Sequence, residues 1–468
     1  MTPFRFIKEI RFFMKCITLC SILLLFLGCE AFLEADSPND QIDQSDVFQD
    51  EAYATAAVTN LYSALRDGVL LTGKTNGLSV LFGLYADELD YYSSSGSAFE
   101  AFYNHQIMAS NTNVKSIWDA SYNLIFMCNS ALEGLDSSQN LSPSVKNQLK
   151  GEALFVRTLV HFYLNNLFGE IPYITSTDYV QNQKVSKTEL EKINQMAIQD
   201  LIEAKAFLND TYPSTERIRA NRSVVSALLA RVYLYNEKWQ EAELESSYII
   251  DNTAIYNLGP SLNEVFLKSS KTTILQLKPK KAGDNTDEAV SFLFSSAPPP
   301  FIALNPDLVS SFLDNDSRKR DWIKEVTDGD QIWYAPFKYK QNQNTKASQE
   351  YSVVMRLSEQ YLIRAEARTH LGNLIGAKQD LNMIRNRAGL EDTTASNSSD
   401  LIEAILTERK FEFFAEHGHR WFDLKRLNKA EEVLGPVKNN WKITHILMPI
   451  PETELLLNPN LAPQNAGY

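Results

Sequence analysis

The residues best suited to chemistry in this chain are aromatic side chains in two stretches that lack a helical period. Trp and Tyr rings stack on the flat C–H face of a sugar, while nearby amides and carboxylates hydrogen-bond its hydroxyl rim. The candidates are Tyr91, Tyr92, Tyr103, Trp322, Trp333 and Tyr334, with Asn104 and Asn342 as polar neighbours. This combination predicts recognition of a carbohydrate.

Motifs for catalysis or metal binding are weak by comparison. Residues 68–75 (GVLLTGKT) have the letters of a phosphate-binding loop, but a helix is expected before them, whereas such a loop follows a strand and opens a helix. His417-Gly418-His419 offers two imidazoles, and a metal site needs three or four ligands. Carboxylate pairs for glycoside hydrolysis stay open, because 58 acidic residues allow many pairs. We expect no catalytic residue, no metal and no cofactor.

Charge and cysteine content narrow the class of protein. The chain has 468 residues, enough for a large core, and a net charge of −13, which argues against nucleic acid as a partner. Of the four cysteines, Cys16 and Cys20 lie in the N-terminal apolar run described next. Cys128 lies in an apolar helical pattern, where we expect a buried free thiol and no internal disulfide.

The N-terminus has the pattern of an export signal. Four basic residues precede an apolar run at residues 16–27, which is too short to span a bilayer. Gly28-Cys29 then resembles a bacterial lipobox, in which the cysteine is lipidated with chains such as palmitate. We therefore expect residues 1–28 to be a signal peptide, Cys29 the lipidation site and residues 29–45 a lipid-anchored tether.

Helical hairpins are the expected frame of the body. Apolar residues recur three and four apart at residues 357–388, where Gly372 and Asn373 break the pattern and Gly389 stands at the place of a C-terminal cap. Residues 226–250 repeat this arrangement, which is typical of tetratricopeptide-like hairpins that must stack to bury their stripes. We also expect Asp400 to cap a third helix, with Glu403 completing the capping box.

The remaining elements follow from local signals. We expect helices at residues 50–65 and 114–135, a helix that opens at Ser142-Pro143, and a helix at residues 188–208 with Thr188 and Glu191 as a capping box. Residues 273–277 could form a strand, and the prolines after residue 434 predict a loop. The body at residues 46–468 is expected to be one domain. Its helical scaffold is expected mainly at 46–66, 114–251 and 355–430, and its irregular, ligand-binding part mainly at 67–113 and 256–349.

Four segments make the chain resemble a known family. VVMRLSEQYLIRAEARTHLGN, AKQDLNMIRNRAGL, ERKFEFFAEHGHRWFDLKR and the tail ILMPIPETELLLNPNLAPQNAGY are closely similar to the SusD/RagB family. The turn after the third segment departs from the family's Glu-Gly-x-Arg form, because His417 stands between Glu416 and Gly418. The charged residues around this turn are expected to form a structural ion-pair and hydrogen-bond network, namely Glu408, Arg409, Glu412, Arg420, Asp423, Lys425 and Arg426.

The resemblance implies a mainly α-helical, SusD-like fold and a place on the cell surface. Members of the family are lipid-anchored outer-membrane proteins that capture a glycan or oligopeptide and pass it to a SusC-like TonB-dependent transporter without transforming it. Their ligand-contacting residues vary, so none can be carried over. We therefore expect a glycan-binding lipoprotein. Two alternatives stay open, namely an oligopeptide-binding lid of the same architecture and a periplasmic helical-repeat scaffold.

Overall fold

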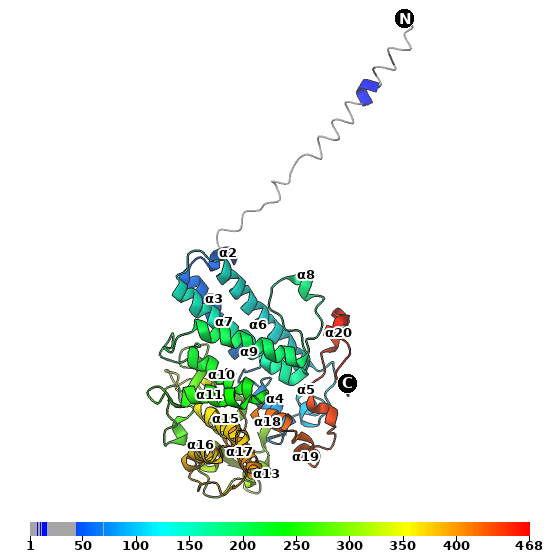
Figure 1. Cartoon of the computed structure of the whole chain (residues 1–468). Helices are drawn as coiled ribbons and strands as arrows, with labels where there is room; N and C mark the ends of the chain where they lie inside the picture. Colours follow the sequence, from blue (N-terminus) through cyan, green and yellow to red (C-terminus); the bar gives the residue numbers. More distant parts are fainter. Residues whose placement is uncertain (1–6, 8–9, 11, 16–43, 69) are drawn as a thin grey trace. The chain divides into compact units, whose positions relative to one another are not determined.

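The computed structural model describes residues 7, 10, 12–15, 44–68 and 70–468 (Figure 1). The expected lipidation site Cys29, and most of the expected signal peptide and tether, lie outside these residues. Residues 44–47 form the short helix α2 (Gln44–Val47). The body that carries the functional site is one compact unit, Phe48–Tyr468.

The body is mainly α-helical, as the sequence predicts. Each long helix packs against the next one in the chain, which gives a continuous series of helix hairpins (Figure 1). The series consists of α3 (Glu51–Asp67), α6 (Thr112–Ser137), α7 (Pro143–Phe168), α9 (Leu190–Phe207), α10 (Arg222–Tyr235), α11 (Trp239–Ile250), α15 (Leu357–His370), α16 (Leu374–Arg387) and α17 (Ser398–Phe413).

The two hairpins expected from the sequence stack on each other, because α11 packs against α15. Small side chains at the contacts let the helix backbones approach closely. Ala242 of α11 and Ala365 of α15 are both fully buried. At one end of the same interface, the rings of Trp239 and His370 stack with 3.9 Å between their centroids. The prediction of stacked helical hairpins is confirmed.

The observed helix caps agree in part with those predicted from the sequence. Gly389 follows α16 with a φ of +80°, in the left-handed region that favours glycine, and the Ser142 side chain caps α7. The prediction for Asp400 is wrong. Asn397 caps α17 instead, since its Oδ1 accepts from the Asp400 N–H at 3.0 Å and the helix begins one turn earlier.

The capping box expected at Thr188 is also absent. The backbone of Thr188 forms a β-bridge with Ile171, and its N–H donates to the Ile171 carbonyl over 2.9 Å. This pairing holds Thr188 in an extended conformation, so α9 begins two residues later, at Leu190. A tertiary contact thus overrides the local signal.

Shorter helices fill the segments between the hairpins. They are α4 (Leu78–Tyr85), α5 (Ala98–Tyr103), α8 (Tyr179–Asn182), α12 (Asp287–Phe292), α13 (Pro306–Ser310), α14 (Ser317–Trp322), α18 (His419–Arg426), α19 (Ala430–Leu434), α20 (Glu452–Leu457), η1 (Leu262–Glu264), η2 (Ile443–Ile446) and η3 (Pro459–Leu461). The C-terminal segment expected as loop therefore contains one short α-helix and two 3-10 turns. Across the described part of the chain, no helix combines the length and hydropathy needed to cross a membrane.

Two small antiparallel sheets complete the body. One pairs β2 (Thr273–Leu277), the strand expected from the sequence, with β6 (Ser352–Arg356). The other has the strand order β1-β3-β5-β4 and consists of β1 (Leu89–Tyr91), β3 (Ile302–Leu304), β5 (Ile332–Pro336) and β4 (Ile323–Thr327). The second sheet was not expected, and it carries the candidate site.

A buried ion-pair network around α17 and α18 is confirmed. Its pairs join Arg318 to Glu408 and Glu412, Arg356 and Arg387 to Glu412, Arg409 and Arg426 to Asp423, and Arg420 to Asp87. Lys425 takes part through a hydrogen bond, because its ammonium donates to the Asn166 carbonyl and pairs with no carboxylate among the described residues. Burial lowers the pKa of Lys425 to about 7.

Candidate functional site

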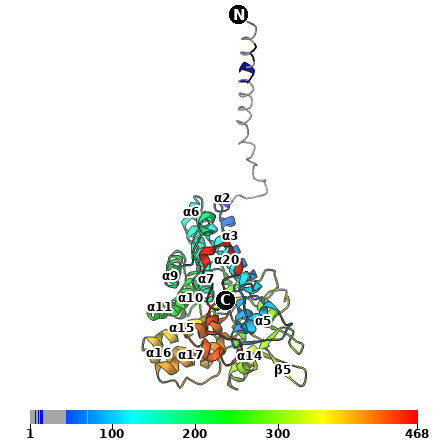
Figure 2. The same cartoon turned by 90° about the vertical axis from the view of Figure 1, so that its right-hand side faces the viewer.

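The four-stranded sheet joins the two stretches in which the sequence places the ligand surface. β1 comes from the stretch at residues 67–113, whereas β3, β4 and β5 come from the stretch at 256–349. The sheet lies beside α5 and α14 (Figure 2). Residues more than 200 positions apart in the sequence therefore share one surface.

Strand register decides which side chains share a face of this sheet. Directly opposite residues of antiparallel strands point to the same side. Asp90 pairs with Ala303, and Trp333 pairs with Val326. Trp333 also packs on an apolar cluster that contains both Ala303 and Val326. Asp90 and Trp333 therefore lie on the same face.

Tyr92 and Tyr103 complete this surface, which we call the aromatic face (Asp90, Tyr92, Tyr103, Asn305 and Trp333). The Tyr103 hydroxyl, at the end of α5, donates to Oδ1 of Asp90 over 3.3 Å. The Asn305 amide donates to the same oxygen over 3.0 Å. Tyr92 is 38% exposed, and the Trp333 side chain is within hydrogen-bond reach of its hydroxyl.

The electrostatics of the aromatic face keep both phenols protonated. Burial and the nearby Asp90 carboxylate raise the pKa of Tyr103 to about 12. The same two causes raise the pKa of Tyr92. The Lys438 ammonium lies 4.2 Å from the centroid of the Tyr103 ring. Rings, hydroxyls, an amide and a carboxylate thus stand together in the combination that binds the apolar face and the hydroxyl rim of a sugar.

Tyr91 has a different role from its neighbour. Its hydroxyl makes hydrogen bonds of 2.9 Å to the Ser94 carbonyl and 2.6 Å to the Ser97 hydroxyl. Its ring packs edge-on against Phe301. Tyr91 therefore holds the exposed loop between β1 and α5 and does not belong to the aromatic face.

Tyr334 lies on the opposite face of the sheet. It pairs with Leu304, which also pairs with Leu89, so these three side chains point away from Asp90 and Trp333. Tyr334 lines a separate pocket of about 510 Å³ between β4, α13 and α14. The structure does not bring Tyr334 together with Tyr92.

The prediction for Trp322 is corrected by the structure. Its side chain is fully buried, and its indole N–H donates to the Leu262 carbonyl over 3.1 Å. Phe266 packs edge-on against the ring. Trp322 therefore fills the core and offers no plate to a ligand.

Sequence reasoning missed Asp90 and Asn305. Asp90 is the middle residue of the three-residue strand β1, and Asn305 directly follows the three-residue strand β3. In the sequence, Asp and Asn at such positions are typical of a loop. Of the two polar neighbours proposed from sequence, Asn104 is the C-terminal cap of α5, and Asn342 is exposed in the loop after β5. Neither makes a hydrogen bond to a residue of the aromatic face.

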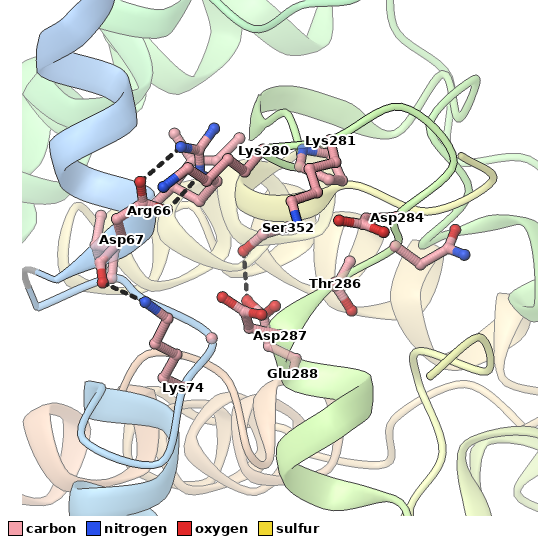
Figure 3. Close-up of a pocket in the computed structure, with 15 residues that line it drawn as sticks. Arg66, Asp67, Lys74, Lys280, Lys281, Asp284, Thr286, Asp287, Glu288 and Ser352 are labelled. Atoms are coloured by element: carbon pink, nitrogen blue, oxygen red, sulfur yellow. Dashed lines mark hydrogen bonds and ion pairs between the residues drawn. The ribbon is translucent and has the colours of Figure 1, made fainter. Parts of the chain in front are cut away.

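A second, polar pocket of about 300 Å³ lies between α3, β2 and α12 (Figure 3). Its lining contains four basic and four acidic side chains, namely Arg66, Lys74, Lys280, Lys281, Asp67, Asp284, Asp287 and Glu288. Arg66 binds Asp67 with two hydrogen bonds of 2.7 Å, as the dashed lines show. The pocket has no aromatic plate, so it does not match the sugar-stacking chemistry of the aromatic face.

The polar pocket also shows why residues 68–75 lack the setting of a phosphate-binding loop. The pattern follows helix α3, not a strand, and the Lys74 ammonium donates to the Asp67 carbonyl over 2.7 Å. The buried carboxylate of Glu288 lies against Gly73, where an added Cβ would be 2.1 Å from its Oε2. Burial raises the pKa of Glu288 to about 7. A carboxylate beside the glycine disfavours phosphate, and the helix expected before the pattern is present.

The paired histidines occupy the buried turn between α17 and α18. Nε2 of His417 lies 3.0 Å from the Val353 carbonyl oxygen, and His419 stacks on Phe413. In the described part of the chain, no group of three or more His, Cys, Asp or Glu side chains is arranged to hold a metal ion. Cys128 is a free, buried thiol, as expected from the sequence.

Comparison with family models gives two matches that together cover most of the chain. The model of the SusD family matches residues 309–468. A model described as "Starch-binding associating with outer membrane" matches residues 31–234. Among curated proteins, SusD-like protein P2 of Formosa agariphila is 27% identical over 97% of this chain and 99% of its own length. SusD-like protein P25 of the same organism is 23% identical over 96% of this chain and 98% of its own length.

Solved structures with the same fold include two that are described as glycan binders. A laminarin binding SusD-like protein has a TM-score of 0.78 at 23% identity and covers 90% of this chain and 100% of its own. Surface glycan-binding protein A from Bacteroides thetaiotaomicron, solved in complex with laminarihexaose, has a TM-score of 0.74 at 19% identity and covers 88% and 99%. At these identities, the likeness establishes a shared fold.

Proposed function

The chain belongs to the SusD family, and from this premise we propose that it captures an oligo- or polysaccharide at the cell surface and passes it to a SusC-like TonB-dependent transporter. Proteins of this family are non-catalytic binding proteins. The name of the N-terminal family model associates it with the outer membrane and with starch. Anchoring through a lipidated Cys29, with residues 1–28 as signal peptide, 29–45 as tether and 46–468 as one domain, is part of this proposal.

One observation supports the glycan-binding part above all others. Tyr92 and Trp333, which come from the two irregular stretches, lie side by side around Asp90 on one face of the sheet. Aromatic plates with a carboxylate and an amide between them suit a neutral sugar, because rings contact its C–H face and polar groups bond its hydroxyls. The relatives described as binding laminarin or laminarihexaose make those glycans the first ones to test.

Isothermal titration of the purified full chain tests this proposal. Laminarihexaose and maltohexaose are titrated in parallel, and trialanine represents the peptide alternative. We expect one of the hexaoses to bind with a dissociation constant of roughly 10 µM to 1 mM, since a few stacks and rim hydrogen bonds leave a small surplus after ordering costs. Chromatography of the ligand after incubation should recover it unchanged.

Two results would overturn the proposal. Binding of trialanine with no binding of either hexaose would favour the oligopeptide alternative. Shortened products after incubation would show that the protein hydrolyses its ligand, which the non-catalytic role forbids.

A further inference from the structure

A lysine from the C-terminal part of the chain contacts the aromatic face. Lys438 follows α19 in the sequence and is only 9% exposed. Its backbone N–H donates to the Leu434 carbonyl over 2.8 Å, and its carbonyl accepts from the Trp441 N–H over 2.9 Å. The turn that carries Lys438 is therefore held on both sides, which restricts where its ammonium can lie.

The Lys438 ammonium binds the ends of two helices. It donates to the Leu84 carbonyl near the end of α4 over 2.8 Å and to the Tyr103 carbonyl at the end of α5 over 3.3 Å. Carbonyls in the last turn of a helix lack a partner within the helix, and a lysine side chain can satisfy them. The Asn440 amide, two residues further on, donates to the Asn104 carbonyl over 2.9 Å. One turn of the chain thus closes the C-terminal end of α5 with two side chains.

Tyr103 receives a second contact from the same ammonium. Nζ of Lys438 lies 4.2 Å from the centroid of the Tyr103 ring, which is within the range of a cation–π interaction, and burial strengthens this interaction. The hydrogen bond from the Tyr103 hydroxyl to Asp90 is 3.3 Å long, beyond the usual range of about 2.5–3.0 Å. Since this bond is weak, Lys438 is needed to fix the ring as well as the backbone of Tyr103.

The ionisable groups that face Lys438 come from several elements. The Asp90 and Asp87 carboxylates favour its charged form, but burial has the larger effect and lowers the pKa of Lys438 to about 8. The Lys438 charge also acts on His105, whose pKa burial lowers to about 3. The pKa of Tyr103 is raised to about 12. Between about pH 6.5 and 9.5, Lys438 therefore loses its charge while His105 stays neutral and Tyr103 stays protonated.

We propose that Lys438 is a positioning residue of the glycan site, an inference that rests on the proposed function. Its ammonium holds the Tyr103 ring in the orientation in which the hydroxyl reaches Asp90, the carboxylate that also binds Asn305. Loss of the ammonium charge releases this ring and weakens glycan binding, although every group of the aromatic face is still present.

Titration of laminarihexaose and maltohexaose into the purified full chain at about pH 6.5 and pH 9.5 tests this role. Lys438→Met keeps the aliphatic stem and removes the charge, whereas Lys438→Arg keeps a charge at both pH values, because the pKa of arginine is about 12.5 or higher. Glu88→Gln is the matched control. Glu88 is buried next to Asp87 and its pKa is also about 8, so this variant removes the other nearby group that titrates in the same range.

We expect the unmodified protein and Glu88→Gln to bind the preferred hexaose at least about fivefold more weakly at the higher pH. Lys438→Met should bind weakly at both pH values. Lys438→Arg should bind more tightly than Lys438→Met at both, with no dependence on pH.

Nuclear magnetic resonance of the protein with carbon-13-labelled tyrosine rings gives a second readout that needs no glycan. The Tyr103 signal is assigned by its loss in Tyr103→Phe. It should shift with a midpoint near pH 8 in the unmodified protein, because the ammonium beside the ring loses its charge, and it should not shift in Lys438→Met.

Three results would overturn the inference. These are equal hexaose affinity of the unmodified protein at the two pH values, a full pH dependence in Lys438→Met, and a pH dependence that disappears in Glu88→Gln. The first and third need no substitution of Lys438, so the test holds even if Lys438→Met does not fold.

The positioning role and glycan capture fail differently. If neither hexaose binds at either pH while the Tyr103 signal shifts with Lys438, glycan capture is refuted and the hold of Lys438 on Tyr103 is supported. If a hexaose binds independently of pH and of Lys438, glycan capture is supported and the positioning role is refuted.

Discussion

Replacing Glu412 by glutamine removes one negative charge from the centre of the buried ion-pair network. Glu412 is fully buried, and three guanidiniums surround its carboxylate, namely those of Arg318, Arg356 and Arg387. Although burial opposes ionisation, Arg387, Arg356 and Arg318 hold the pKa of Glu412 well below its ordinary value. The substitution Glu412→Gln keeps the size of the side chain and leaves these cations with less compensation.

Of the three arginines, Arg387 loses most of its charge compensation in this variant. Arg318 keeps Asp316 and Glu408 as partners, and Arg356 keeps Glu416. Arg387 has no carboxylate other than Glu412 among the described residues, and its guanidinium is almost inaccessible. Breaking a buried pair by removing one partner costs about 3–5 kcal/mol, and we expect Glu412→Gln to destabilise the body by this amount.

Chemical and thermal denaturation of the purified chain measure this effect. The body is the unit Phe48–Tyr468. For a unit of that size, the loss corresponds to a decrease in melting temperature of about 3–6 °C. The double variant Glu412→Gln/Arg387→Met should recover part of the loss, because it removes the stranded charge together with its partner. The control Glu432→Gln, in an exposed pair with Lys429, should leave the midpoint unchanged, since solvent screens that pair.

Two outcomes would refute this reasoning. A loss below about 1 kcal/mol for Glu412→Gln would mean that the neighbouring carboxylates already compensate Arg387. A double variant less stable than Glu412→Gln would mean that Arg387 stabilises the body through packing, independently of its charge.

Two further predictions concern pH and membrane attachment. Burial and the neighbouring Asp87 raise the pKa of Glu88 from 4.5 to about 8. Between these two pH values the folded protein therefore holds a proton that the unfolded chain releases. The contribution of Glu88 to stability is fully present below pH 4.5 and is lost as the pH rises towards 8. Glu88→Gln should flatten this loss in melting temperature between pH 5 and pH 8, and an unchanged pH profile would contradict it. Cys29→Ser should move the protein from the membrane fraction to the soluble fraction and abolish labelling by a palmitate analogue, whereas retained label would place the lipid elsewhere.

The helical scaffold was readable from sequence because its signals are local. Buried alanines such as Ala242 and Ala365 recur at helical spacing within one hairpin, and Gly389 marks a helix end by its own backbone preference. The four-stranded sheet was not readable, because β1 pairs with β3 across more than 200 residues and each has only three residues. Strand pairing at this separation depends on the whole fold, and strands of three residues show almost no alternating pattern in the sequence.

The candidate site, too, could be predicted from the sequence only in part. Aromatic composition indicated the two stretches, residues 67–113 and 256–349, that form the four-stranded sheet. It could not distinguish a buried ring from a half-buried one. Trp322 and Trp333 are eleven positions apart in one irregular stretch, and tertiary contacts such as those with Leu262 and Phe266 place Trp322 in the core. The partner residue Asp90 carried no sequence signal, because its role arises when α5 and β3 bring Tyr103 and other donors to its carboxylate.

Glycan binding at the aromatic face is the central claim, and titration of laminarihexaose and maltohexaose into matched variants tests it most directly. Tyr92→Ala removes a plate of the aromatic face, and Tyr334→Ala removes a comparable ring from the opposite face of the sheet. The account predicts that Tyr92→Ala weakens binding of the preferred hexaose at least tenfold, about 1.4 kcal/mol or more, while Tyr334→Ala changes it less than twofold. Equal affinity in Tyr92→Ala and the unmodified protein, or a loss confined to Tyr334→Ala, would contradict it.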